Sequence, residues 1–257
     1  MQVRIMRVSL YEMDHGQCPY LENRKWITHS FSSAEADPRM YENLLSHGWR
    51  RSGRTYYQNH CPGCASCIPI RVPAEDFLPS KSQRRVMRRN EDVRFTVAPS
   101  VFDRETYELY CRYVESRHNA ADATTELEFE HFLADSPQKT QIMRYFADGR
   151  LIGAGWIDVL PDGVSSVYFA FDPRESGRSL GTFSVTQEIV YARSLGKKWL
   201  YLGFYVPGSR KMAYKANFKP HQLLVNGAWS DLSFLSEKAE TSTFNVENPK
   251  SPEETVS

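Results

Sequence analysis

The sequence lacks any uncharged stretch close to the roughly 18 residues that a membrane-spanning helix needs. Its first residues are partly polar and charged, so there is no apolar core of signal-peptide length at that end. Net charge is nearly absent, at +1, and the 257 residues include only five cysteines. This small, odd number argues against a disulfide framework in a chain of this size. We therefore expect a soluble, cytoplasmic protein that makes no membrane contact.

The small net charge hides a strongly basic segment, SKSQRRVMRRNEDVR, at residues 80–94. On a helix, Arg84 would neighbour Arg88 and Arg85 would neighbour Arg89, and like charges at this spacing repel each other. A bound polyanion would relieve that repulsion, whereas a solvated helix face is the simpler alternative. The candidate nucleic-acid contacts are Lys81, Arg84, Arg85, Arg88 and Arg89.

Three of the cysteines lie at intervals of three in the segment HCPGCASCIPIR. Thiolates separated by two residues can bind one metal from a tight turn, and a fourth ligand is then needed. We expect the ligand set Cys18, Cys61, Cys64 and Cys67, with His15 and His60 as substitutes. It would hold a structural zinc ion or an iron-sulfur cluster, and the alternative is that these are small buried residues.

The pattern of elements predicts an α+β fold in three parts. Residues 1–92 form a smaller, Cys-rich and basic region of short strands and turns, with one basic segment that favours a helix. Residues 93–235 read as strand, two helices, three strands, helix, strand, helix, strand. This order resembles the GNAT fold, a mixed sheet with helices on both faces that opens between residues 164–171 and 198–204. Residues 236–257 form an acidic tail that we expect to be disordered.

The segment PRESGRSLGTFS precedes the long helix expected from Ser179 to Leu195. In GNAT enzymes a loop of the form Q/R-x-x-G-x-G/A presents backbone N–H groups to the pyrophosphate of coenzyme A. Arg174 and Gly177 fit that pattern, but Ser179 stands where a smaller residue is usual. The segment is therefore a weak signal for coenzyme A, and a capped helix start explains it equally well.

Longer segments resemble the arginyltransferase family of aminoacyl-tRNA:protein transferases, and among them most closely the bacterial aspartate/glutamate leucyltransferases. The segments are CPYLENRKW, YENLLSHGWRRSGRTYY, CPGCASCIPIRV, FLPSKSQRRVMRRNEDV, SSVYFAFDP, RSLGTFS and WLYLGFYVPGSRKMAYKANFKP. The resemblance runs to about Trp229 and implies transfer of Leu from Leu-tRNA to the N-terminal amine of proteins beginning with Asp or Glu. Such a product enters N-degron proteolysis. The ester is already activated, so no cofactor is expected for the chemistry.

The resemblance and the expected opening together suggest a set of site residues. Catalytic candidates are Tyr168, Asp172 and Tyr205. Candidates for substrate binding are Arg50, Arg51, Arg71, Ser179, Lys211, Tyr214 and Lys215. The tyrosines have core packing as their alternative role. Two rival functions remain at this stage: a GNAT acetyl-CoA N-acetyltransferase, and an iron-sulfur redox or sensor protein in which the thiols act.

Overall fold

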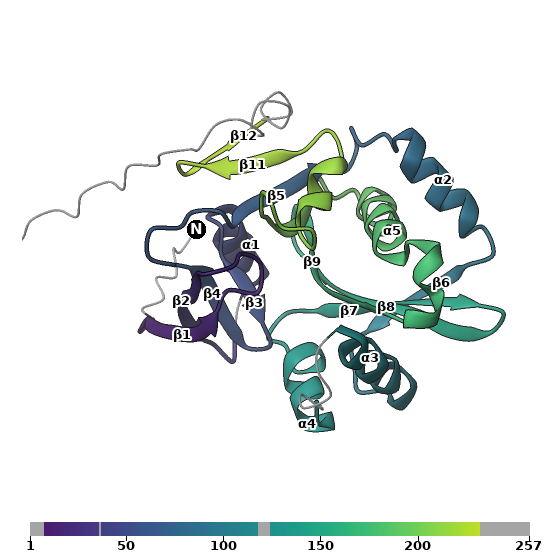
Figure 1. The fold of residues 1–257 in the computed structure, drawn as a ribbon, viewed down its shortest axis with the longest axis horizontal. Coiled ribbons are helices and arrows are strands. Elements are labelled where there is room, and N and C mark those ends of the chain that lie inside the picture. The colour runs from purple at the N-terminus through teal and green to yellow at the C-terminus, as the bar shows by residue number, and fades with distance from the viewer. Residues whose placement is uncertain (1–7, 36, 118–123, 232–257) are drawn as a thin grey trace, which may run out of the picture.

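The computed structural model describes residues 8–35, 37–117 and 124–231, which fold into two β-sheets with helices around the larger one (Figure 1). The expected disordered tail, residues 236–257, lies outside the described residues. The larger sheet has eight strands in the order β12-β11-β5-β10-β9-β8-β7-β6. Their bounds are β5 Ile68–Pro73, β6 Arg94–Pro99, β7 Thr140–Ala147, β8 Arg150–Val159, β9 Gly163–Phe171, β10 Trp199–Tyr205, β11 Gln222–Val225 and β12 Ala228–Ser230.

The smaller sheet has the order β1-β2-β4-β3, all antiparallel. Its strands are β1 Tyr11–Gln17, β2 Lys25–Ser32, β3 Arg50–Ser52 and β4 Thr55–Asn59. The helices are α1 Pro38–Ser46, α2 Lys81–Arg89, α3 Arg104–Arg117, α4 Glu126–Phe129 with a π turn at Glu130–Ala134, and α5 Leu180–Ser194. Two short 3-10 helices, η2 Pro173–Arg178 and η3 Ala213–Asn217, flank α5 and β10 along the chain. None of the described helices is long and apolar enough to cross a membrane.

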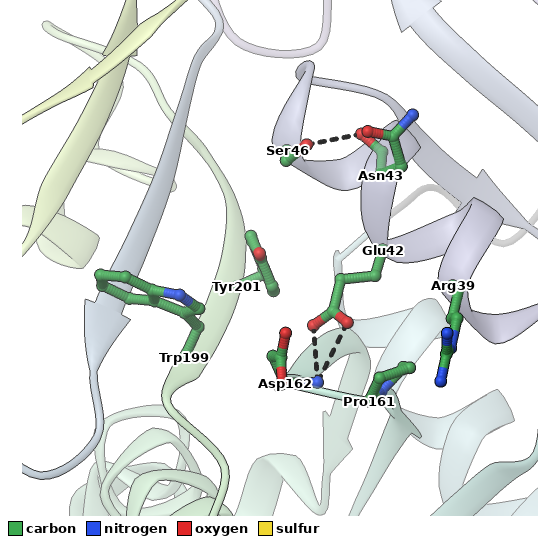
Figure 2. A pocket seen from close by; sticks show the side chains of 8 residues that line it. All are labelled: Arg39, Glu42, Asn43, Ser46, Pro161, Asp162, Trp199 and Tyr201. Carbon is green, nitrogen blue, oxygen red and sulfur yellow. Dashed lines mark hydrogen bonds between the residues drawn. The ribbon is translucent and has the colours of Figure 1, made fainter. Parts of the chain in front are cut away.

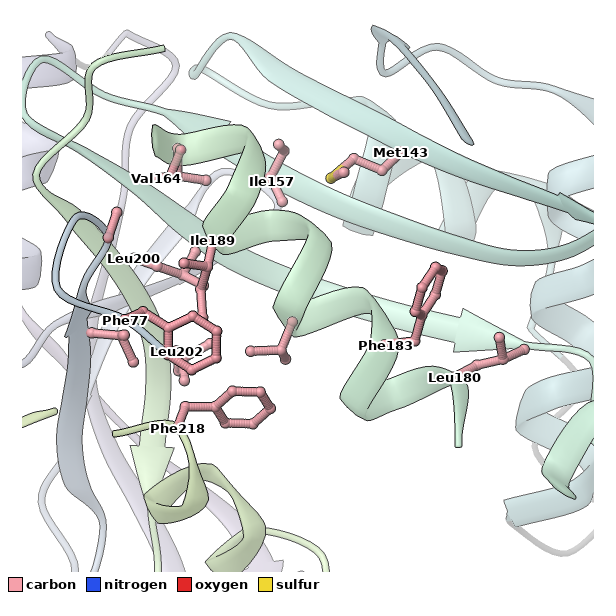
Figure 3. Packing of buried hydrophobic residues seen from close by; sticks show 14 of the residues in the cluster. Phe77, Met143, Ile157, Val164, Leu180, Phe183, Ile189, Leu200, Leu202 and Phe218 are labelled. Carbon is pink, nitrogen blue, oxygen red and sulfur yellow. The ribbon is translucent and has the colours of Figure 1, made fainter. Parts of the chain in front are cut away.

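Helices cover both faces of the larger sheet, which confirms the expected α+β fold class. In Figure 1, α5 and α2 lie on one side of strands β7 and β8, and α3 and α4 lie on the other. The core beneath α5 includes Leu180, Phe183 and Ile189, which Figure 3 shows among side chains of the sheet. A second core lies between the sheet and α3, around Leu109 and Trp156. Apolar surface is thus removed from water on both faces, the main favourable term in folding.

Local sequence signals account for several element boundaries. Thr125 caps α4, because its hydroxyl accepts a hydrogen bond from the backbone N–H of Glu128. The Glu128 carboxylate in turn accepts a hydrogen bond from the backbone N–H of Thr125. Asp148 and Gly149 join β7 to β8 with positive φ angles of 49° and 72°, values that favour glycine or aspartate. Ser80 caps α2 through an equivalent capping box with Gln83. These signals are short-range, because each involves residues within three positions of the element boundary.

The N-terminal region contributes a strand to the larger sheet. Strand β5 pairs with β10 on one side and with β11 on the other, although it comes from the first 92 residues. The expected last strand is β11, and β12, which was not expected, pairs with it as a hairpin. The expected division after residue 92 therefore does not follow the sheet boundaries, because β5 holds β11 and β12 onto the rest of the sheet.

Candidate active site

Strands β9 and β10 separate part-way along their length. They are parallel and pair only from Gly163 to Ser165 and from Trp199 to Tyr201. Beyond these residues each strand keeps only its antiparallel neighbour, β8 or β5, with a register shift in each ladder. We call this place, after Ser165 and Tyr201, the β9–β10 split. It is the opening that the sequence predicts.

Arg50 occupies the start of the β9–β10 split. Its Nη1 donates to the Ser165 hydroxyl at 3.1 Å, and its Nη2 donates to the Ser166 carbonyl oxygen. Ser166 is the first residue of β9 beyond its pairing with β10, so the guanidinium donates to a β9 carbonyl at the point where the two strands part. Arg50 comes from β3 of the smaller sheet and is only 8% exposed. A residue expected to bind substrate therefore lies at the split, held in place on its β9 side.

Lys215 meets Arg50 on the β10 side of the split. A side chain at Gly203 would place its Cβ 3.4 Å from Lys215 Nζ and 3.5 Å from Arg50 Cζ. The glycine has φ +85°, a conformation in which other residues are strained. Burial first, and then the positive charge of Arg50, lowers the pKa of Lys215 to about 7. A guanidinium and an amine that titrates near neutral pH therefore converge over a glycine of β10.

Glu188 of α5, which is 1% exposed, was not among the residues expected from the sequence. Its Oε1 accepts a hydrogen bond from the Ser184 hydroxyl at 3.0 Å, and that hydroxyl accepts one from Tyr145 at 3.3 Å. Its Oε2 has no hydrogen-bond partner among the described residues. Burial is the main cause that raises the pKa of Glu188 to about 7. The sequence offered one signal for Glu188: it is an acidic residue four positions from both Ser184 and Ala192, and so it lies on the apolar face of the helix.

The remaining candidates on this side have different surroundings. Tyr214 is partly buried against Phe218, and burial followed by the charge of Glu188 raises its pKa to about 12. Tyr205 at the end of β10 is partly buried against the core beneath α5. Ser179 precedes α5 with φ +57°, and its carbonyl accepts the N–H groups of the first helical turn. Lys211 is exposed in the loop after β10.

The other two catalytic candidates come from the far part of β9. Tyr168 lies on the α3 face, ringed by Tyr110, Tyr113 and Phe132, and burial raises its pKa. Asp172 follows β9 and caps η2, where its carboxylate accepts from the backbone N–H and the guanidinium of Arg174. These hydrogen bonds lower the pKa of Asp172. Its geometry is that of a helix cap.

Arg51 and Arg71 lie away from the split. Arg51 is 1% exposed and donates to both carboxylate oxygens of Asp158, which is fully buried, and to Thr140 and the Gly53 carbonyl. This arrangement argues against a substrate contact for Arg51. The guanidinium of Arg71 lies between two tryptophan rings, 3.7 Å from the centroid of Trp199 and 4.2 Å from that of Trp229. It also donates twice to Gln222.

A surface pocket of about 460 Å³ lies beside Trp199 and Tyr201, at the paired end of β10 (Figure 2). Glu42 of α1 points into it and accepts hydrogen bonds from the backbone N–H of Asp162. Burial raises the pKa of Glu42. Because β9 and β10 are still paired here, this pocket is separate from the β9–β10 split.

The four expected cysteine ligands are free thiols. Burial first, and then repulsion from Cys18, Cys61 and Cys64, raises the pKa of Cys67 to about 12, so the four lie within electrostatic reach. The Cys61 thiol contacts the backbone of Ile27. Within the part of the chain that is described, however, no three His, Cys, Asp or Glu side chains are placed to hold a metal ion. The four thiols lie near one another without forming a group placed to hold an ion among the described residues, and we derive no step through a metal.

The basic segment forms helix α2, packed against α5. Arg84 donates to the Pro79 carbonyl and Arg89 to the Gly177 carbonyl, in the loop before α5. Lys81, Arg85 and Arg88 are exposed and make no hydrogen bond or ion pair among the described residues. The helix therefore presents unneutralised cations beside the N-terminal end of α5.

The eight-stranded mixed sheet, its single splayed parallel pair and its helices on both faces define a GNAT-like fold. Among solved structures, FemX is similar to this chain at 10% identity with a TM-score of 0.49, covering 77% of this chain and 70% of that one. The sequence profile for "Arginine-tRNA-protein transferase, N terminus" matches residues 16–85, and that for its C terminus matches residues 105–225.

Curated relatives extend this match over most of the chain. The aspartate/glutamate leucyltransferase of Marinobacter nauticus is 36% identical over 219 residues, covering 84% of this chain and 92% of that protein. The protein of that name from Aeromonas hydrophila is 37% identical over 224 residues, with the same coverage. The chain therefore belongs to the arginine-tRNA-protein transferase family, and it is an aminoacyltransferase.

Proposed function

We propose that this protein transfers Leu from Leu-tRNA to the N-terminal amine of proteins that begin with Asp or Glu, and thereby marks them for N-degron proteolysis in the cytoplasm. The observation that carries the proposal is the 34–37% identity to aspartate/glutamate leucyltransferases over more than four-fifths of the chain. The β9–β10 split supplies a site in which to do the chemistry. Aminolysis of an ester needs placement and charge stabilisation, so the proposed reaction uses no cofactor.

In this proposal the β9–β10 split binds the leucyl ester and the acceptor amine side by side. The fixed positive charge of Arg50 favours an acceptor with an acidic first side chain. Tyr205, Lys211 and Tyr214 follow along the chain from the end of β10, and in this proposal they contact the substrates from that side, with Ser179 at the start of α5. The exposed cations of α2 bind the tRNA backbone, since tRNA is a polyanion.

The test is a grid of donors and acceptors. Purified protein is incubated with labelled Leu-tRNA, Arg-tRNA, Phe-tRNA or acetyl-CoA, and with peptides that begin with Asp, Glu, Lys or Ala. We expect product only from Leu-tRNA with the Asp and Glu peptides. Acetylated product without leucylated product would replace this function by the acetyltransferase alternative.

Removing charge from α2 should weaken tRNA binding. Arg85→Gln and Arg88→Gln each remove one exposed cation without breaking an interaction in the structure. We expect each to lower the affinity for tRNA and to reduce the slope of log K against log salt by about one. Fluorescence anisotropy over a salt series measures both quantities.

The matched control is Lys139→Gln, which removes one exposed charge from the loop before β7. Its affinity and salt slope should equal those of the unchanged protein. If all three variants behave alike, α2 is not the tRNA-binding surface.

A further inference from the structure

The proposed function leaves Glu188 without a role. This carboxyl group is sealed beneath α5, with Ser184 bonded to one oxygen and no partner for the other among the described residues. Gly155 of β8 lies beside it, because a Cβ there would be in ordinary van der Waals contact with Oε1 at 3.6 Å. A buried carboxylate without a full set of donors is costly, so the site favours a carboxyl group that keeps its proton or shares one.

Lys215 is the neighbouring base, and unlike Glu188 it remains partly exposed. The charged and titratable groups around the two are Arg50 of β3, Tyr145 of β7, Tyr214 of η3 and Cys67 of the loop before β5. Arg50 is the one group of these four that is permanently charged. Its positive charge disfavours an ammonium on Lys215, whereas an ionised Glu188 would favour one. The protonation of Lys215 is therefore coupled to that of Glu188.

Amide formation requires a group that can take up one proton and then release it. The acceptor nitrogen bonds to the leucyl carbonyl carbon, and the bond from that carbon to the ribose oxygen breaks. The nitrogen loses one proton and the ribose oxygen gains one, so a single amine that carries the proton between them balances the step. No oxidant, reductant or metal is required.

We propose that Lys215 is the catalytic residue that carries this proton, and that Glu188 is a positioning residue that sets the protonation of Lys215 from behind. The inference rests on the proposed function, because it assumes that transfer takes place at the β9–β10 split. The pKa of Lys215, lowered to about 7, and that of Glu188, raised to about 7, place both groups where small changes alter their charge at physiological pH.

The first experiment measures kcat for leucyl transfer against pH. Lys215→Met should lower kcat by about 10²–10⁴-fold, the usual contribution of a proton-transfer group. Glu188→Gln removes the larger of the charges that raise the pKa of Lys215, so the rising acidic limb should move to lower pH. Ser184→Ala removes a hydrogen bond that lowers the pKa of Glu188, and should move the limb in the same direction by less. The acceptor amine also titrates and adds its own limb to the profile of kcat against pH, and none of these variants should shift that limb.

The control is Glu42→Gln, which replaces another glutamate with a raised pKa in the separate pocket at α1. Its pH profile should match that of the unchanged protein. A Lys215→Met variant within a few-fold of full activity would overturn the proposal. So would Glu188→Gln and Ser184→Ala profiles that coincide with the control.

A second measurement does not depend on transfer. An amine-reactive reagent at limiting concentration, with the sites located by mass spectrometry, reports which lysine is neutral near pH 7. We expect Lys215 to react first, and Glu188→Gln to shift the midpoint of its labelling to lower pH. If labelling follows this expectation but no leucyl product forms, the proposed function fails and the coupled pair stands. If transfer occurs but Lys215 labels like the exposed lysines, the pair is wrong.

Discussion

Gly203→Val should lower kcat/KM for leucyl transfer by at least about 10²-fold, the loss that a displacement of about 1 Å in a catalytic group can cause. A Cβ at this position already reaches contact distance of Lys215 Nζ and Arg50 Cζ. The two further methyl groups of valine would overlap one or both. The substitution thus displaces the Arg50 and Lys215 side chains at the β9–β10 split without altering either residue.

Backbone strain needs a separate control, since valine is also unfavourable at φ +85°. Gly149 in the β7–β8 turn has φ +72°, and a Cβ there would meet nothing within 4 Å, so Gly149→Val carries similar strain without displacing a neighbour. Thermal melts measure the strain in both variants, and steady-state kinetics measure transfer. Equal activity in the two variants would show that transfer does not depend on the positions of Lys215 and Arg50 beside Gly203.

Asp158→Ala should lower the free energy of unfolding by about 3–5 kcal/mol, because it leaves Arg51 as an uncompensated buried charge. The pair is 1% and 0% exposed, with Arg51 Nη2 2.8 Å from Asp158 Oδ1. It joins β3 of the smaller sheet to β8 of the larger one. Urea denaturation followed by circular dichroism measures the change.

The Arg54–Asp135 ion pair offers a comparison at the protein surface. It is as short, at 2.6 Å, but its side chains are 51% and 32% exposed. Asp135→Ala should therefore cost less than about 1 kcal/mol, as is usual for pairs that water screens. Similar losses for Asp158→Ala and Asp135→Ala would mean that burial does not decide the strength of these ion pairs.

The fold of residues 93–225 was predictable because its signals are local. Apolar runs bounded by the turns at Asp148–Gly149 and Pro161–Gly163 predict β7, β8 and β9, and Thr125 opens a helix. The split between β9 and β10 followed from the order of elements. Two of the residues expected at it, Arg50 and Lys215, lie there.

Features that depend on distant pairing were not predictable. Adjacent arginines look alike in sequence, yet Arg50 faces the split whereas Arg51 faces Asp158, which lies 107 residues further along the chain. The insertion of β5 between β10 and β11 has no local sequence signal either, because the sequence of a strand does not specify which strands pair with it. Glu188 was not predicted as a site residue, because the sequence does not show which groups surround an acidic residue on an apolar helix face.

The position of β5 limits how the chain can be divided. A break after residue 92 would leave β10 and β11 with exposed edges in one fragment, and would leave β5 without either partner in the other. Asp158 and Arg51 would also be parted, each losing its counter-ion. We therefore expect neither fragment to remain soluble when produced alone. Exchange of one half between relatives should succeed only where β5 still fits between β10 and β11 and where Arg51 still meets a buried acid.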